Sequence, residues 1–203
     1  MAHAHGMLAT GAAATCTADA KPVMRKFAVA QVREGAGFVV RRAIGGGGIS
    51  QEESDPFLLL DELPPTVFTP NEFRGEPWHT RQGLLSATYV KEGEWEYDFE
   101  GNLGDGGRLT AGECKWVNAG RGGVRMAEGC NHRGGPLHVF QVFVNMTDLQ
   151  KQAPAVVGDI VEVATANCTE EVSAKVIAGA CAGVKAFYEP VTPIHFVDSG
   201  RPI

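Results

Sequence analysis

Short strands punctuated by glycine between Trp78 and Glu128 constrain the fold of this chain more than any other feature. Acidic and aromatic residues alternate strictly from Glu94 to Phe99, as in a strand with one face in a core and the other in water. The apolar run Leu84 to Val90 precedes it, and glycine-rich turns separate it from the next candidate strand, Lys115 to Val117. Many short strands with such turns predict an all-β sandwich or small barrel.

The composition indicates a globular intracellular protein and argues against direct binding of nucleic acid. Lys and Arg number 18 against 24 Asp and Glu, which gives a net charge of −6 without a basic run. Such a chain is poorly suited to the phosphate backbone. The 5 cysteines have no C-x-x-C spacing and no secretory signal before them, which predicts reduced thiols. No apolar run approaches the length of about 18 residues that predicts a membrane helix.

Four segments are expected along the 203 residues. Residues 1–24 are rich in alanine and threonine, lack hydrophobic periodicity, and are expected to be a disordered tail. Residues 25–147 contain the strand pattern and are expected to form one complete barrel. Residues 148–171 are predicted to be a linker, and residues 172–203 to contribute further strands.

Several consecutive motifs resemble those of the pirin family. They are VRRAIGGGG with DPFLLLDEL, then HTRQGLLSATYVKEGE, then AGECKWVNAGRGGVRMAE, and finally LHVFQVFVN, in the order of the family. Pirins are bicupins, in which one longer chain forms two stacked β-barrels. The resemblance implies a cupin-type jelly-roll barrel for residues 25–147, an interdomain linker, and only the first strands of a second cupin barrel in residues 172–203.

Two explanations of this short second part stay open. The favoured one is that the sequence is a fragment or a mis-terminated gene model, whose last strands would have unpaired edges and exposed apolar faces. The alternative is a single-barrel protein whose tail packs on the first barrel or on a partner subunit.

The resemblance also implies an iron centre in the first barrel, held by an H-x-H pair and an H-x-E pair. Residues two apart in a strand point to the same face, so each pair would send two ligands inward. Alignment of the motifs places the first pair at His79 and Arg81 and the second at Arg125 and Ala127. Arginine has no lone pair to offer and stays protonated, so only His79 occupies a ligand position with a ligand. Glu128 lies one residue farther on and is expected to point to the other face, unless a bulge near Gly122 and Gly123 turns it back inward.

We therefore expect a degraded iron site and a protein without enzymatic activity, which binds a partner or regulates. The family implies two activities: oxygenation of flavonols such as quercetin, and iron-dependent transcriptional co-regulation. The second would bring a transcription factor or another protein as partner, and a cytoplasmic or nuclear location. The alternative is an iron-dependent flavonol dioxygenase with a rearranged ligand set, in which His79 binds the metal together with His132 or His138.

The same substitutions suggest a binding site for a small anion. If Arg81 and Arg125 both point into the barrel mouth beside His79, their guanidinium groups would suit a carboxylate or phosphate. The competing interpretation pairs the two arginines with Glu76, Glu128 or other nearby acids and gives them a purely structural role.

Overall fold

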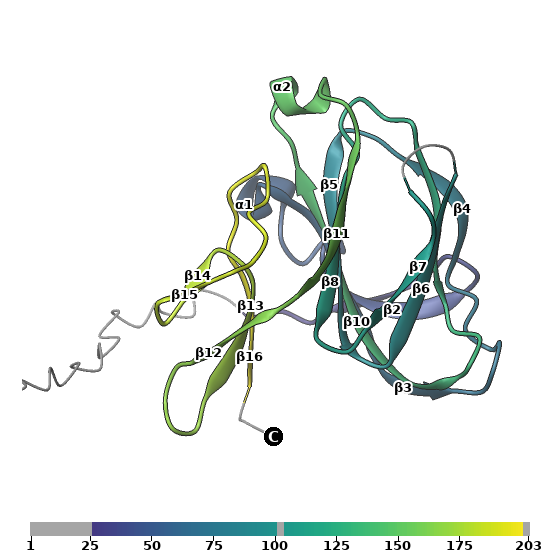
Figure 1. Ribbon diagram of the computed structural model, residues 1–203, viewed down its shortest axis with the longest axis horizontal. Helices are drawn as coiled ribbons and strands as arrows, with labels where there is room; N and C mark the ends of the chain where they lie inside the picture. Colours follow the sequence, from purple (N-terminus) through teal and green to yellow (C-terminus); the bar gives the residue numbers. More distant parts are fainter. Residues whose placement is uncertain (1–25, 101–103, 201–203) are drawn as a thin grey trace, which may run out of the picture.

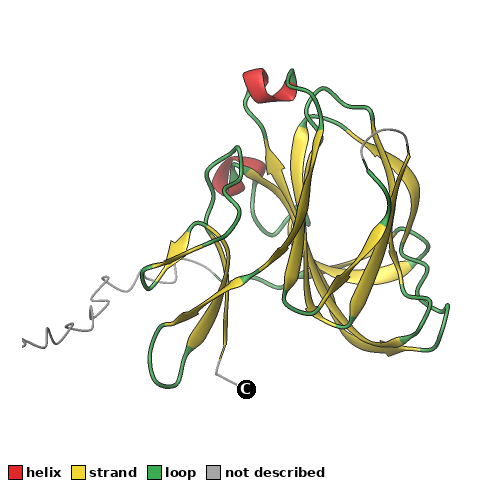
Figure 2. Ribbon diagram, in the orientation of Figure 1, coloured by secondary structure: helices red, strands yellow, loops and turns green. Residues whose placement is uncertain are grey.

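The computed structural model describes residues 26–100 and 104–200, and most of these residues lie in β-strands (Figures 1 and 2). The predicted tail, residues 1–24, lies outside the described residues. Two single-turn helices interrupt the strands, α1 (Gln51–Ser54) and α2 (Asp148–Lys151). Neither helix has the length and apolar character that crossing a membrane requires.

The first part of the described chain folds into two facing antiparallel sheets that enclose a core, seen on the right of Figure 1. One sheet has seven strands in the order β1-β2-β3-β10-β5-β8-β11. These are β1 (Ala30–Glu34), β2 (Phe38–Ile44), β3 (Phe57–Phe68), β10 (Gly135–Asn145), β5 (Leu84–Glu92), β8 (Glu113–Asn118) and β11 (Val156–Glu162). The other sheet has four strands in the order β4-β9-β6-β7. These are β4 (Glu76–Arg81), β9 (Val124–Cys130), β6 (Glu94–Glu100) and β7 (Gly107–Thr110). The predicted all-β, jelly-roll type of fold is confirmed.

The residues of the alternating pattern that the barrel buries are aromatic. In β6, Trp95 and Phe99 are buried, whereas Asp98 is exposed on the outer face. Inside the barrel, the ring of Phe73 is surrounded by Phe38, Phe68 and Trp95, with ring centroids 4.9, 4.8 and 5.7 Å away. Aromatic pairs at these separations add about 0.5–1.5 kcal/mol each beyond the area that they bury. This cluster fills one region of the interior and leaves the polar residues of β4 and β9 beside it.

The second part of the described chain lies against the outer face of the seven-stranded sheet (Figure 1). It contains a sheet of β12 (Ala164–Asn167), β13 (Ser173–Ala178) and β16 (Phe196–Gly200), and a hairpin of β14 (Ala180–Cys181) and β15 (Val184–Lys185). The rings of Trp116 and Tyr188 stack across this contact with centroids 4.8 Å apart. Tyr89 donates a hydrogen bond to Asp198 at 3.3 Å. That these strands begin a second barrel stays a prediction.

The segment predicted as a linker, residues 148–171, contains two strands. Residues 156–162 form β11, which pairs with β8 at the edge of the barrel sheet, and residues 164–167 form β12. Pairing supplies the physical reason: the backbone of residues 156–162 satisfies the free edge of β8, which a loop would leave open.

Candidate functional site

Strand β4 directs three polar side chains toward the barrel interior. His79 and Arg81 lie two residues apart and share a face, as predicted. The pairing between β4 and β9 shifts register between Glu76 and His79, so Glu76 joins them although it lies three residues before His79. Gly75, just before the strand, has φ +59°, and a Cβ on it would lie 2.2 Å from the carbonyl oxygen of Glu128. Glycine at this position therefore allows β4 and β9 to approach closely.

The inward residues of strand β9 lie one position later than the motif alignment predicts. Val124, Met126 and Glu128 are buried, whereas Arg125 is exposed. The turn before the strand contains Gly122 and Gly123, both with positive φ (+97° and +84°), a backbone conformation that glycine adopts readily. The inward pair is therefore Met126 and Glu128, not Arg125 and Ala127, and the prediction that Glu128 faces away was wrong.

Arg125 is separated from the other predicted site residues. Its guanidinium group forms an ion pair with Glu100 and lies 5.4 Å from the ring centroid of Trp78, on the outer face of the sheet. Half of its side chain (50%) is exposed. The structure brings His79 and Arg81 together but leaves Arg125 outside, so a small anion cannot be held by all three predicted residues in this arrangement.

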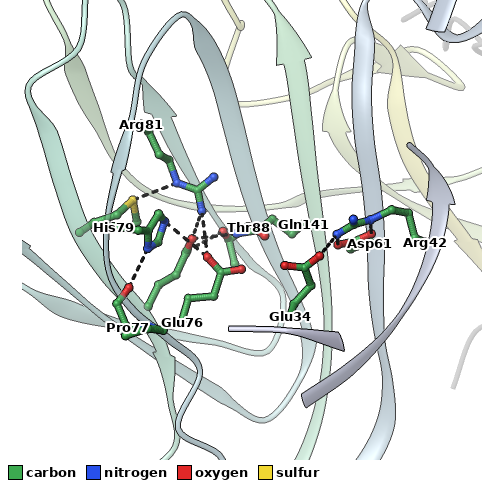
Figure 3. Close-up of polar contacts among 11 residues, drawn as sticks. Glu34, Arg42, Asp61, Glu76, Pro77, His79, Arg81, Thr88 and Gln141 are labelled. Carbon is green, nitrogen blue, oxygen red and sulfur yellow. Dashed lines mark hydrogen bonds and ion pairs between the residues drawn. The ribbon is translucent and has the colours of Figure 1, made fainter. Parts of the chain in front are cut away.

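The Arg81 guanidinium group occupies the centre of the site (Figure 3). Its side chain is 3% exposed and forms an ion pair with Glu128, which is equally buried. Its Nη2 also lies 3.8 Å from Glu76 Oε2, and its Nε donates to the sulfur of Met126 at 3.3 Å. The face of the guanidinium group lies 4.4 Å from the ring centroid of Phe143. One arginine thus contacts both inward residues of β9 and the first inward residue of β4.

The carboxylate of Glu128 receives further hydrogen bonds from the opposite sheet. Gln141 on β10 donates its side-chain amide to Oε1 at 2.8 Å, and Thr88 on β5 donates its hydroxyl to Oε2 at 3.3 Å. Burying an ion pair is tolerated only when its remaining hydrogen-bonding capacity is satisfied. These partners meet that need here, so the carboxylate of Glu128 accepts hydrogen bonds from Arg81, Gln141 and Thr88.

His79 and Glu76 form the more open side of the site. The Nδ1 atom of His79 lies 2.9 Å from the carbonyl oxygen of Pro77, and its Nε2 lies 3.4 Å from Glu76 Oε2. That buried Nε2 makes no hydrogen bond to any described residue. Burial raises the pKa of Glu76, and the nearby charge of Glu128 raises it further, while Arg81 and His79 partly offset the effect.

Three of these side chains could together hold a metal ion. The donor atoms of Glu76, His79 and Glu128 all lie within 4.8 Å of one another. The two other histidines considered from the sequence lie elsewhere: His132 pairs with Asn71, and His138 with Glu62. The sequence suggested Glu76 only as an ion-pair partner of the arginines. A regular strand does not place residues i and i+3 on one face, so only the register shift brings Glu76 to the site.

A second guanidinium group lies at the other side of the same cleft. Arg42 donates to Glu34 at 2.5 Å and to both oxygens of Asp61 at 2.8 and 2.6 Å (Figure 3). The cleft between the two arginines has a volume of about 290 Å³, and Glu76 and His79 are among the residues that line it. Each arginine faces carboxylates. The walls of this small cleft beside His79 therefore carry both positive and negative groups.

Comparison with known proteins places the chain among the pirins. The family model described as Pirin matches residues 37–144. Pirin-like protein 2 of Arabidopsis thaliana is 32% identical over 188 residues, which is 88% of this chain and 52% of that protein. Pirin of Rattus norvegicus is 29% identical over 184 residues, 89% of this chain and 59% of its own length. The chain thus spans little more than half the length of these relatives.

Solved structures support the same assignment. The crystal structure of quercetin 2,3-dioxygenase from Acinetobacter baumannii superposes with a TM-score of 0.72 at 26% identity, covering 84% of this chain and 60% of that one. A structure from Geobacillus kaustophilus superposes with a TM-score of 0.70 at 25% identity, covering 88% of this chain and 67% of that one. With the barrel, the ordered motifs and the family match in agreement, the chain belongs to the pirin family of cupin proteins.

Proposed function

We propose that this chain is a pirin-family cupin in which the side chain of Arg81 takes the place of the metal ion, and that it acts as a non-enzymatic binding or regulatory protein. The observation that carries the proposal is the buried ion pair between Arg81 and Glu128. Arg81 lies at a position that the family resemblance assigns to an iron ligand, and Glu128 takes the position assigned to Ala127 once the register of β9 is corrected.

The residues at those four positions do not fit iron. With the register of β9 corrected, the positions hold His79, Arg81, Met126 and Glu128. Arginine has no lone pair to donate. A methionine thioether suits softer ions such as Cu(I) better than iron. Only His79 and Glu128 remain as suitable donors, and Glu128 is already paired with a fixed positive charge.

Binding of a cation would also disrupt the interior of the barrel. A metal ion at Glu128 would have to displace Arg81, leaving a 3% exposed guanidinium group without its main partner. Removing one member of a buried ion pair costs about 3–5 kcal/mol. The arrangement therefore favours a barrel that folds and stays intact without a metal.

A binding or regulatory role is compatible with such a barrel, because neither needs chemistry at the site. The partner class carried over from the family is a transcription factor or another protein, with a cytoplasmic or nuclear location. A small anion is the less supported ligand, because the guanidinium groups of Arg42 and Arg81 each already face two carboxylates. These neighbours reduce the attraction that either arginine offers to an anion.

A second candidate function is that of an iron-dependent flavonol dioxygenase with a rearranged ligand set. It is favoured by the proximity of donor atoms from Glu76, His79 and Glu128, and by the likeness to a quercetin 2,3-dioxygenase. In this alternative Glu76 replaces one of the family's histidines, and Arg81 must move away from Glu128 before the site can bind a metal.

Elemental analysis and oxygen uptake distinguish the two functions. The protein is expressed with added iron, purified, and assayed for bound iron and for oxygen consumption with quercetin. We expect iron far below one equivalent and no oxygen uptake. Nearly stoichiometric iron that is lost in His79→Ala but retained in His132→Ala, together with quercetin-dependent oxygen uptake, would establish the dioxygenase instead. His132 is the matched control because it lies outside the group of three donors.

A further inference from the structure

Two thiols lie close together in the second part of the chain, away from the barrel interior. Cys168 follows the last residue of β12, and Cys181 ends β14, 13 positions later. Their sulfur atoms are 3.6 Å apart. We propose that Cys168 and Cys181 are a redox-sensitive pair that forms a reversible disulfide, linking the end of β12 to the β14-β15 hairpin.

The local backbone holds the two residues in position for this bond. The backbone N–H groups of Cys168 and Thr169 both donate to the carbonyl oxygen of Val172, at 2.9 and 3.1 Å, which fixes the turn after β12. The N–H of Ala186 donates to the carbonyl oxygen of Gly179 at 2.9 Å, which closes the hairpin around Cys181. A disulfide has an S–S length of about 2.05 Å, so the sulfur atoms must approach by side-chain rotation while these turns stay in place.

Partial burial makes the pair accessible to a small oxidant. Both side chains are neither fully exposed nor fully buried. Cys181 packs against a small apolar cluster made of β12 and β13 residues, Ala164, Ala166 and Val176. The other described cysteines have different surroundings: Cys114 is 1% exposed in the main core, and Cys130 donates its thiol to the carbonyl oxygen of Arg74 at 3.4 Å.

The reaction balances with a peroxide as the oxidant. One thiolate attacks hydrogen peroxide, the O–O bond breaks, and the products are a sulfenic acid and hydroxide, which takes up the released proton to become water. The second thiol then attacks the sulfenic sulfur, the S–S bond forms, and a second water leaves. Two sulfur atoms are oxidised and one peroxide is reduced to two waters. A dithiol such as dithiothreitol reverses the bond by thiol–disulfide exchange.

The disulfide would lock the small sheet that lies against the barrel. The chain between the two cysteines contains the whole of β13, which is the central strand between β12 and β16. A cross-link across these residues restricts the unfolded chain and so raises the stability of the folded sheet. β16 contacts the barrel, where Asp198 pairs with Lys91 at 2.8 Å. Oxidation is therefore expected to stabilise this contact as well.

Mass spectrometry of the folded protein tests the proposal. The full chain is treated with hydrogen peroxide, free thiols are blocked, and the protein is digested without reduction. We expect a linked peptide pair containing Cys168 and Cys181, a loss of two hydrogen atoms in the intact mass, and restoration of both thiols by dithiothreitol. The linked pair should be absent in Cys168→Ser and Cys181→Ser and unchanged in Cys130→Ser. Oxidation should raise the midpoint of thermal unfolding of the wild type and of Cys130→Ser. It should not raise the midpoint of Cys168→Ser or Cys181→Ser.

Two results would overturn the proposal. One is that Cys168 and Cys181 both stay open to alkylation after peroxide treatment that oxidises another thiol of the folded wild type. The other is that they join different cysteines or a second copy of the chain. Both measurements are made on the wild type, so they hold even where a serine variant fails to fold.

Discussion

Arg81 on β4 and Glu128 on β9 form an ion pair in which both side chains are 97% removed from solvent, since each is 3% exposed. The pair joins two neighbouring strands of the same sheet, and both side chains point into the barrel. The guanidinium group of Arg81 places a positive charge beside the carboxylates of Glu76 and Glu128 inside the barrel.

Breaking the pair from one side should destabilise the barrel strongly. Arg81→Met leaves Glu128 buried without its cation, and Glu128→Leu leaves Arg81 without its anion. Each variant should lose about 3–5 kcal/mol of unfolding free energy, while Arg81→Met combined with Glu128→Leu should lose much less. Urea unfolding of the three variants gives this double-mutant cycle. Additive losses in the double variant would show that the two side chains do not depend on each other.

Arg125 should contribute little to stability, although it is an arginine in an ion pair on the same strand as Glu128. Its side chain is half exposed and its partner Glu100 is more exposed still. Exposed pairs are worth about 0–1 kcal/mol. We expect Arg125→Ala to change the urea midpoint only slightly. A loss as large as that of Arg81→Met would mean that Arg125 belongs to the interior after all.

Gly75→Ala should open the contact between β4 and β9. The added Cβ would lie 2.2 Å from the carbonyl oxygen of Glu128, and the residue has φ +59°. Alanine at such a position destabilises by more than about 1 kcal/mol. Gly37→Ala is the control, because Gly37 also has positive φ (+103°) but its Cβ would meet no atom within 4 Å. Thermal unfolding should show the larger loss for Gly75→Ala, and equal losses would remove the argument from close strand approach.

Tyr188→Ala should loosen the second part of the chain from the barrel. Tyr188 stacks on Trp116 with centroids 4.8 Å apart, and such a pair adds about 0.5–1.5 kcal/mol beyond the area that it buries. Limited proteolysis should cut residues 164–200 faster in this variant, and the fluorescence of Trp116 should shift toward that of an exposed indole. Val191→Ala, at an exposed position in the same part, is the control. Unchanged cleavage would mean that other contacts hold the two parts together.

Most of the barrel could be predicted from the sequence, because alternation and glycine turns act locally. The Glu94 to Phe99 pattern specifies β6 without reference to the remaining strands. The motifs also placed His79 and Arg81 correctly on one face of β4. The sequence does not indicate β11, because its pairing with β8 is a long-range property, and the Gly158-Asp159 interruption of its apolar residues also fits a linker.

The candidate site was predicted only in part, because small irregularities decide which side chains face inward. The inward residues of β9 lie one position later than the motif alignment predicts, so Met126 and Glu128 take the places of Arg125 and Ala127 on the inner face. A register shift in β4 added Glu76. Neither event has a reliable signal in a single sequence, since a slip of one residue leaves the apolar pattern almost unchanged while reversing every polar side chain.

Restoring the two missing histidine ligands tests the central claim most directly. Arg81→His combined with Met126→His would give the four inward positions three histidines and Glu128. The test measures iron binding by elemental analysis and titration calorimetry, alongside the wild type and Arg125→His, which adds one histidine on the outer face. The account predicts nearly one equivalent of iron in the double variant and little in the other two proteins. Equal, stoichiometric iron in the wild type and the double variant would contradict the claim that Arg81 takes the place of the metal.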